Sequence, residues 1–214
     1  MCIRDRWRDT ECEAGVFYEY GIRKTIVKDS LYAYGYAAAG ASVPSRPVRG
    51  QCLLLVDSIV KSSLDVELSS LRKSLWDEGW IVTLQNAPRT PSFSPDAVKI
   101  TKDIIRAWWT SCDGEPATVI LIGRIAVPYS GMTYQGQNYP GPDGHPEHSG
   151  AWAADTYYAC MADDASWVDD ATNNSGKYPD NKNLPGDGRF DNITMPGYAD
   201  IRVGRVDFYN MGLF

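Results

Sequence analysis

Two stretches in the second half of the chain, residues 161–170 and 187–191, bring several carboxylates into a region rich in turn-forming residues. Carboxylate oxygens on turns are the ligands that Ca²⁺ prefers, and a bound cation would offset their mutual repulsion. The sequence therefore predicts a calcium site made by four aspartates: Asp163, Asp164, Asp187 and Asp191. The alternative is a solvated acidic loop whose aspartates stabilise turns through side-chain hydrogen bonds.

The two histidines of the chain form a second candidate metal site. His145 and His148 are three residues apart, with Asp143 and Glu147 beside them. Imidazole and carboxylate groups could bind a transition metal, and the 143–191 loop would then serve a metal-dependent hydrolase. Pro146 disfavours a helix at this point, and the HExxH pattern of many zinc enzymes is absent. A hydrogen-bonded pair of loop histidines is the expected structure.

Composition and motifs exclude several classes of function. The formal net charge is -6 and no cluster of Lys and Arg is present, so a nucleic acid is not an expected partner. No apolar run is long enough to span a membrane. The glycine-rich signatures of dinucleotide and P-loop enzymes are absent, and so is the GxSxG motif. The five cysteines lack CxxC spacing, and Cys52, within an apolar run, is expected to be a buried free thiol.

Alternating strands and helices must position these loops. Short apolar runs between turn residues are typical of strands buried on both faces, and apolar residues at helical spacing indicate the connecting helices. The pattern predicts strands at 52–56, 80–84 and 118–123, helices at 62–79 and 94–113, and a further strand at 201–206. The expected fold is α/β, a parallel βαβαβ, Rossmann-like three-layer sheet. A long irregular insertion, residues 124–198, interrupts it.

Capping residues set the expected ends of the two helices. Ser62, with Asp65 three residues later, is predicted to cap the first helix, which Gly79 ends. Ser94 and Pro95 are predicted to begin the second helix. Its apolar stripe is expected to contain Ile100, Ile104, Ile105 and Trp108.

The carboxyl ends of the predicted strands are the expected place for a ligand. Asp57 follows the first strand of the sheet, and Gly123 and Arg124 follow the third. In open parallel sheets, ligands bind outside these ends. The position predicts a site but names no reaction.

The N-terminal part of the chain has a different pattern. Residues 1–6 are interpreted as read-through of sequencing-adapter DNA rather than native protein. Residues 7–45 contain aromatic-rich runs with partial alternation, which predict a small, partial β segment. Its Tyr18-Glu-Tyr20 spacing after a turn resembles the tyrosine corner of a fibronectin type III module, while an ordinary hairpin is the alternative. Residues 46–50 are the expected linker.

From residue 50 to residue 209 the chain resembles the gingipain-type cysteine peptidases. The matches occur in the family's order: a buried strand at Leu53–Val56, Gly79-Trp-Ile-Val82, Val119–Pro128, Ala154-Asp-Thr-Tyr-Tyr158 and Ala199-Asp-Ile-Arg-Val-Gly-Arg205. The motif positions are Gly123, Asp155, Tyr158, Asp200, Gly204 and Arg205. Arg124 departs from the pattern, because the family has an acidic residue there.

The resemblance implies a function for the parent protein. Family members hydrolyse peptide bonds with a Cys thiolate and a His, while backbone N–H groups stabilise the oxyanion. Both catalytic residues lie after the position that Arg205 matches, so residues 51–214 would be an incomplete peptidase domain without its dyad. Protein substrates, an extracellular location, structural calcium and the missing C-terminal half of the domain as a partner are implied too. A surface or adhesion protein that kept the fold and lost the dyad is the alternative.

Overall fold

The computed structural model describes residues 8–14, 16–26, 31–41, 48–131, 149–174, 177–209 and 211, and divides the chain into two units, Met1–Val48 and Arg49–Phe214. The first unit holds an antiparallel hairpin of β1 (Phe17–Ile26) and β2 (Leu31–Gly40). None of its described side chains is buried. Two strands without a core are marginal in water, so this hairpin contributes little stability of its own.

The second unit is built on a parallel sheet of four strands with the order β4-β3-β5-β8. The strands are β3 (Gly50–Asp57), β4 (Trp80–Ala87), β5 (Ala117–Ile122) and β8 (Arg202–Val206). Leu53, Leu54 and Leu55 of the central strand β3 are fully buried, each worth about 1.5–3 kcal/mol of burial free energy. The prediction of an α/β chain with a parallel sheet is confirmed.

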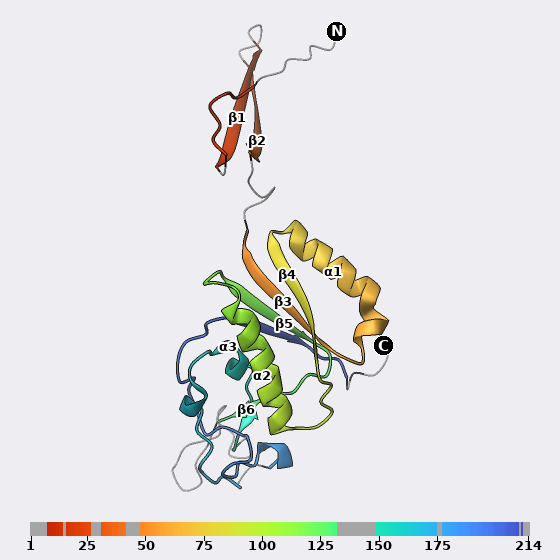
Figure 1. The fold of residues 1–214 in the computed structure, drawn as a ribbon, viewed down its shortest axis with the longest axis vertical. Helices are drawn as coiled ribbons and strands as arrows, with labels where there is room; N and C mark the ends of the chain where they lie inside the picture. The colour runs from red at the N-terminus through yellow and green to blue at the C-terminus, as the bar shows by residue number, and fades with distance from the viewer. Residues whose placement is uncertain are drawn as a thin grey trace. The chain divides into compact units, whose positions relative to one another are not determined.

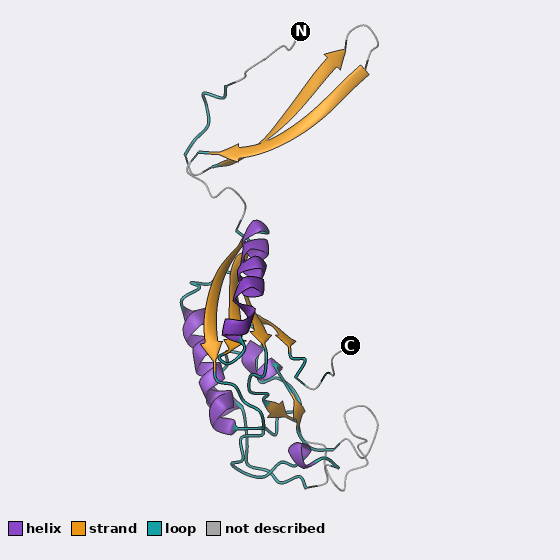
Figure 2. Cartoon of the chain, turned by 90° about the vertical axis from the view of Figure 1, so that its right-hand side faces the viewer, coloured by secondary structure: helices purple, strands orange, loops and turns teal. Residues whose placement is uncertain are grey.

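Two long helices cover opposite faces of the sheet (Figures 1 and 2). Helix α1 (Asp65–Asp77) packs through Leu68 on the cluster that contains Leu54 and Val56. Helix α2 (Pro95–Thr110) packs on the larger core cluster that contains Leu53, Leu55 and Leu121. Neighbouring residues of β3 therefore face different helices, as the two-residue period of a strand requires. No helix in the described part of the chain is long and apolar enough to cross a membrane.

Two details of the helices differ from the expectation. Helix α1 begins after a 3₁₀ turn, η1 (Lys61–Leu64), and its N-cap is Leu64 without a side-chain hydrogen bond, so the predicted Ser62 cap is wrong. Ser94 does cap α2, because its hydroxyl accepts a hydrogen bond from the backbone N–H of Ala97. Ile100 was expected in the buried stripe of α2 but is 47% exposed, and Lys102 is buried instead.

The described residues of the insertion between β5 and β8 form short elements. Strands β6 (Tyr129–Ser130) and β7 (Trp152–Ala153) pair antiparallel, and α3 (Thr156–Ala159) follows them. Its described residues also form two 3₁₀ turns, η3 (Asp164–Ser166) and η4 (Pro179–Asn181). An aromatic cluster of Tyr157, Trp167 and Phe190 joins these turns to the core, with the Tyr157 and Phe190 rings stacked at 4.7 Å.

Candidate functional site

The carboxyl edge of the sheet contains a topological switch point. The first strand, β3, lies between the second, β4, and the third, β5. The chain thus leaves β3 toward one side of the sheet and leaves β5 toward the other, and ligands bind at this kind of position in doubly wound proteins. Asp57 ends β3, and Gly123 and Arg124 follow β5, so the structure places these three predicted residues together at this point.

Asp57 lies at the switch point. Its side chain is fully buried and accepts a hydrogen bond of 2.7 Å from the Arg89 guanidinium. The backbone N–H groups of Ile59 and Arg124 donate to the same carboxylate at 2.9 and 3.2 Å. Gly123 has φ of 90°, and a Cβ there would lie 2.7 Å from the Asp57 Cβ. Glycine is therefore required at 123, and the Asp57 carboxylate serves as an internal anchor rather than an open ligand.

Two arginines surround one aromatic ring just outside this anchor. The guanidinium carbons of Arg89 and Arg124 lie 5.2 and 4.6 Å from the centre of the Tyr209 ring. Arg124 also forms an ion pair of 3.2 Å with Asp207, as Arg89 does with Asp57. The positive charges of Arg89 and Arg124 are therefore matched by the negative charges of Asp57 and Asp207. Residues 57–60, 87–90, 123–126 and 207–209 of this edge include neither a thiol nor an imidazole.

The motif residues Asp155, Tyr158 and Arg205 meet beside this edge although they are far apart in the chain. Arg205 of β8 donates two hydrogen bonds to the Asp155 carboxylate, at 2.7 and 2.8 Å. The same guanidinium donates to the carbonyls of Ile125 and Ala126 at 2.8 and 3.0 Å. The fully buried Tyr158 donates its hydroxyl to the Ala126 carbonyl at 2.9 Å, and burial raises the pKa of Tyr158. One arginine thus joins β8, the chain after β5 and the start of α3.

Asp200 and Gly204 complete the motif positions. The Asp200 carboxylate accepts a 2.7 Å hydrogen bond from the Met161 N–H, and the Asp200 N–H donates to the carbonyl of Ala159. Asp200 therefore connects the segment just before β8 to the C-terminal end of α3. Gly204 pairs with Ile120, and no atom lies within 4 Å of a Cβ built there. Nothing in the structure explains a glycine at 204.

Lys102 is a buried cation that the sequence analysis missed. It lies on α2 and is 1% exposed, and its ammonium donates hydrogen bonds to the carbonyls of Tyr157 and Cys160. The ammonium also lies 4.8 Å from the centre of the Tyr157 ring. Burial lowers the pKa of Lys102 to about 8. Lys102 follows Val98 by four residues, so helical spacing could have placed it on the buried face.

Three of the four described cysteines are buried. Cys52, Cys112 and Cys160 are between 0% and 4% exposed, whereas Cys12 is exposed. The expectation of a buried free thiol at Cys52 is confirmed. Burial raises the pKa of Cys52 to about 11 and also raises the pKa of Cys112. A thiol must be accessible as thiolate to act as a nucleophile, so none of the buried three has the surroundings of a catalytic cysteine.

We expect a thiol reagent to distinguish these cysteines. Iodoacetamide at neutral pH should alkylate Cys12 in the native protein and leave Cys52, Cys112 and Cys160 unmodified, because the reagent cannot reach them. Peptide mapping by mass spectrometry would measure the modification of each site. Unfolding in guanidinium should make all of them reactive, as the control. Native labelling of Cys160 as fast as Cys12 would contradict the burial described here.

Each of the four aspartates of the predicted calcium site has its own hydrogen-bond partners. Asp163 caps η3, and Asp164 forms a bidentate pair with Arg106 of α2 at 2.6 and 3.1 Å, which lowers the pKa of Asp164. Asp187 accepts hydrogen bonds from the N–H of Leu184 and from Arg189. Asp191 accepts from the Asp170 and Ala171 N–H groups and the Asn183 amide. Asp163 and Asp187 thus stabilise turns, the role given by the alternative prediction, whereas Asp164 and Asp191 join segments that are farther apart in the chain.

Metal binding stays a prediction for this chain. Within the described ranges, no group of three or more His, Cys, Asp or Glu side chains is arranged to hold a metal ion. His145 and His148, the second candidate pair, lie outside the described residues. The site that the structure does bring together is the switch point with its adjoining motif residues. Arg89, Asp207 and Tyr209 belong to it as well, and only their positions just after strands could have indicated this.

Comparisons with family models, with curated proteins and with solved structures found no match.

Proposed function

We propose that residues 51–214 are the first part of a doubly wound, Rossmann-like catalytic domain of a secreted gingipain-type cysteine peptidase. The contact between Asp155 and Arg205 carries the proposal. These residues belong to two separate motifs of the resemblance, and the structure joins them by two hydrogen bonds. The Tyr158 hydroxyl, from the first of these motifs, reaches the Ala126 carbonyl within the Val119–Pro128 segment. Motif residues of a real relative should be mutually supporting in this way.

In this proposal the described residues have a positioning role. The anchored Asp57 and the four hydrogen bonds of Arg205 fix the carboxyl ends of β3, β5 and β8. The Cys and His would follow β8 and act at the same edge, where a thiolate attacks the peptide carbonyl and the imidazole transfers protons. Polypeptides are then the substrates, and the rest of the domain is the partner of this sheet. Calcium in the acidic loop belongs to the same proposal.

One contact in the hairpin unit supports a fibronectin type III-like module before the peptidase domain. The Tyr18 hydroxyl accepts a 3.0 Å hydrogen bond from the backbone N–H of Glu13, five residues earlier. A tyrosine corner makes this kind of bond, from a ring hydroxyl to backbone a few residues upstream. The exposed faces of β1 and β2 would then pack against further strands of the module.

The test compares this chain with a longer reading frame from the same gene. We expect the 214-residue chain to cleave no peptide, with or without reductant, because Cys52, Cys112 and Cys160 are buried and none of its cysteines occupies the family's catalytic position. The longer protein should contain an HG segment and a Cys after Arg205 and should cleave peptides. Replacing that Cys with alanine should abolish cleavage and leave the fold intact.

Two results would contradict the peptidase proposal. Cleavage by the present chain that Cys160→Ala abolishes would place the chemistry elsewhere. A longer frame without the His and Cys would favour the adhesion protein.

A further inference from the structure

The strand β4 is an open edge of the parallel sheet. Among the described residues, its eight residues form a ladder only with β3, so the opposite row of backbone N–H and C=O groups has no strand partner. Natural edge strands are usually protected by Pro, Lys, a bulge or a covering segment. The β4 sequence Trp-Ile-Val-Thr-Leu-Gln-Asn-Ala has neither Pro nor Lys and continues in register from Trp80 to Ala87.

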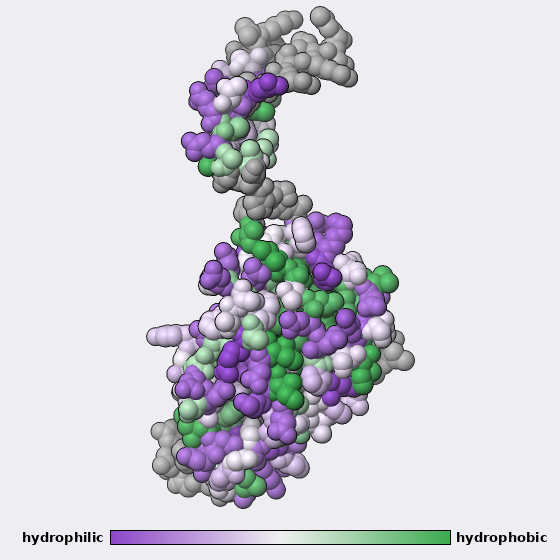
Figure 3. All heavy atoms as spheres, in the orientation of Figure 1, coloured by the Kyte–Doolittle hydropathy of each residue, from purple (hydrophilic) through white to green (hydrophobic). Residues whose placement is uncertain are grey.

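Apolar side chains accompany this open backbone. Ile81 is 47% exposed, and Trp76 at the end of α1 is 70% exposed. Trp80, Val82 and Leu84 are only partly buried where they pack on the α1 side of the sheet. Figure 3 shows apolar residues along the region that β4 occupies in Figure 1. An exposed, regular and apolar edge is a template for pairing with another strand.

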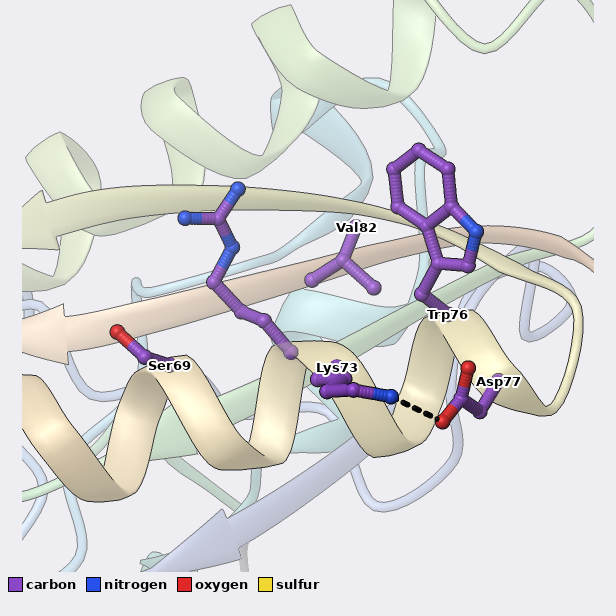
Figure 4. Close-up of a pocket in the computed structure, with 6 residues that line it drawn as sticks. Ser69, Lys73, Trp76, Asp77 and Val82 are labelled. Atoms are coloured by element: carbon purple, nitrogen blue, oxygen red, sulfur yellow. Dashed lines mark hydrogen bonds and ion pairs between the residues drawn. The ribbon is translucent and has the colours of Figure 1, made fainter.

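A hollow of about 410 Å³ lies between α1 and this edge. It is lined by Ser69, Arg72, Lys73, Trp76 and Asp77 of α1 and by Val82 of β4. Figure 4 shows Trp76 rising from the helix beside Val82, with the Lys73–Asp77 pair along the helix. That ion pair measures 2.8 Å, and its side chains are 77% and 49% exposed. A strand added to β4 would thus contact the Trp76 ring and the Lys73–Asp77 ion pair.

We propose that β4 pairs antiparallel with β4 of a second copy of this chain, which joins two sheets into one. A two-fold axis perpendicular to the sheet produces this arrangement and keeps α1 of both copies on the same face. Opposite residues of an antiparallel pair point to the same face. One residue must therefore lie opposite its own copy at the axis. If this residue is Val82 or Thr83, the paired segment is centred on the exposed part of β4.

The hollow suits a second copy because its lining carries charges of both signs, Arg72 and Lys73 with Asp77. An isologous interface presents the same patch on both sides, so opposite charges within that patch can meet across the axis. Lys73 and Asp77 are one helical turn apart and border Val82. An axis near Val82 brings Lys73 of each copy toward Asp77 of the other, and each Trp76 toward apolar side chains of the other β4. An unrelated acidic peptide would leave Asp77 facing a like charge.

The molar mass in solution tests this proposal. Sedimentation velocity and light scattering over about a hundredfold range of protein concentration should show a mass that rises from 23.7 kDa toward twice that value. Ile81→Lys should raise the dissociation constant at least about tenfold, because the axis introduces two charges into the interface. Trp76→Ser should weaken association in the same direction. Val66→Lys is the matched control, since Val66 is 78% exposed on α1 and does not line the hollow.

A cross-link tests the register independently of affinity. In a Cys12→Ser background, Val82→Cys or Thr83→Cys, whichever lies at the axis, should form a disulfide-linked dimer on mild oxidation. Val66→Cys should not. Circular dichroism would verify that each variant is folded. A monomer at every concentration, a dimer that Ile81→Lys leaves unchanged, or equal cross-linking at residue 66 would each overturn the proposal.

Discussion

Replacing Asp57 with alanine is expected to lower the free energy of unfolding of the second unit by about 3–5 kcal/mol. The Asp57 carboxylate is fully buried and accepts hydrogen bonds from Arg89 and from two backbone N–H groups. Its removal leaves those donors without an acceptor and leaves the Arg89 charge, only 22% exposed, without its counterion. Unfolding in urea, followed by circular dichroism, would measure the loss.

A double-mutant cycle separates the ion pair from the rest of the anchor. Asp57→Asn keeps the shape and one of the two oxygen acceptors, so we expect it to lower stability less than Asp57→Ala does. Arg89→Met should also destabilise the protein, but adding it to Asp57→Ala should cost little more, because both changes remove the same pair. If Asp57→Ala lowered stability by less than about 1 kcal/mol, the assignment of Asp57 as an anchor would be wrong.

Replacing Arg205 with lysine is expected to lower the free energy of unfolding by about 2–4 kcal/mol. Lysine keeps the charge, but an ammonium cannot reproduce the planar fork that binds Asp155 through two nitrogens while also reaching two carbonyls. The unpaired Ile125 and Ala126 carbonyls would lose their donor. The same urea titration measures this variant.

Arg202→Lys is the matched control for Arg205→Lys. Arg202 lies in the same strand but is exposed, so the same chemical change there should alter stability by less than about 0.5 kcal/mol. Asp155→Asn should reproduce most of the Arg205→Lys effect, since it removes the charge at the other end of the pair. Equal effects at 202 and 205 would mean that the guanidinium geometry does not matter.

The strands and helices of the sheet could be predicted because the local and tertiary signals agree. The apolar run at Cys52–Val56 is β3, and the Ser94-Pro95 signal begins α2 as expected. The predicted start of α1 was wrong because a 3₁₀ turn at Lys61–Leu64 precedes the helix. In this turn the Ser63 hydroxyl donates a hydrogen bond to the Val60 carbonyl. A serine side chain can form hydrogen bonds with several nearby backbone groups, and the sequence alone does not determine which of them it binds.

The candidate site was predictable in position but not in its contacts. Strand ends placed Asp57 and Gly123 at one edge, whereas the partner Arg89 depends on where the loop after β4 turns. The burial of Lys102 was not predicted because its partners are backbone carbonyls. Every residue has a backbone carbonyl, so the residue types at 157 and 160 do not indicate these contacts. The aspartates of the insertion predict a cation site, and their amide and guanidinium partners in the structure are contacts that the sequence did not indicate.

The late position of β8 in the chain has a consequence for how the protein folds during synthesis. Residues 50–122 contain β3, β4 and β5 with both long helices, so a core can close as soon as this segment has left the ribosome. β8 pairs with β5 only after residues 123–201 have been translated, and it joins at the rim of a sheet that already exists. Closing so long a loop loses more conformational entropy than pairing strands that are close in the chain. A nascent chain would therefore expose the unpaired side of β5 throughout the translation of the insertion, which makes that interval the time when a chaperone could act on it.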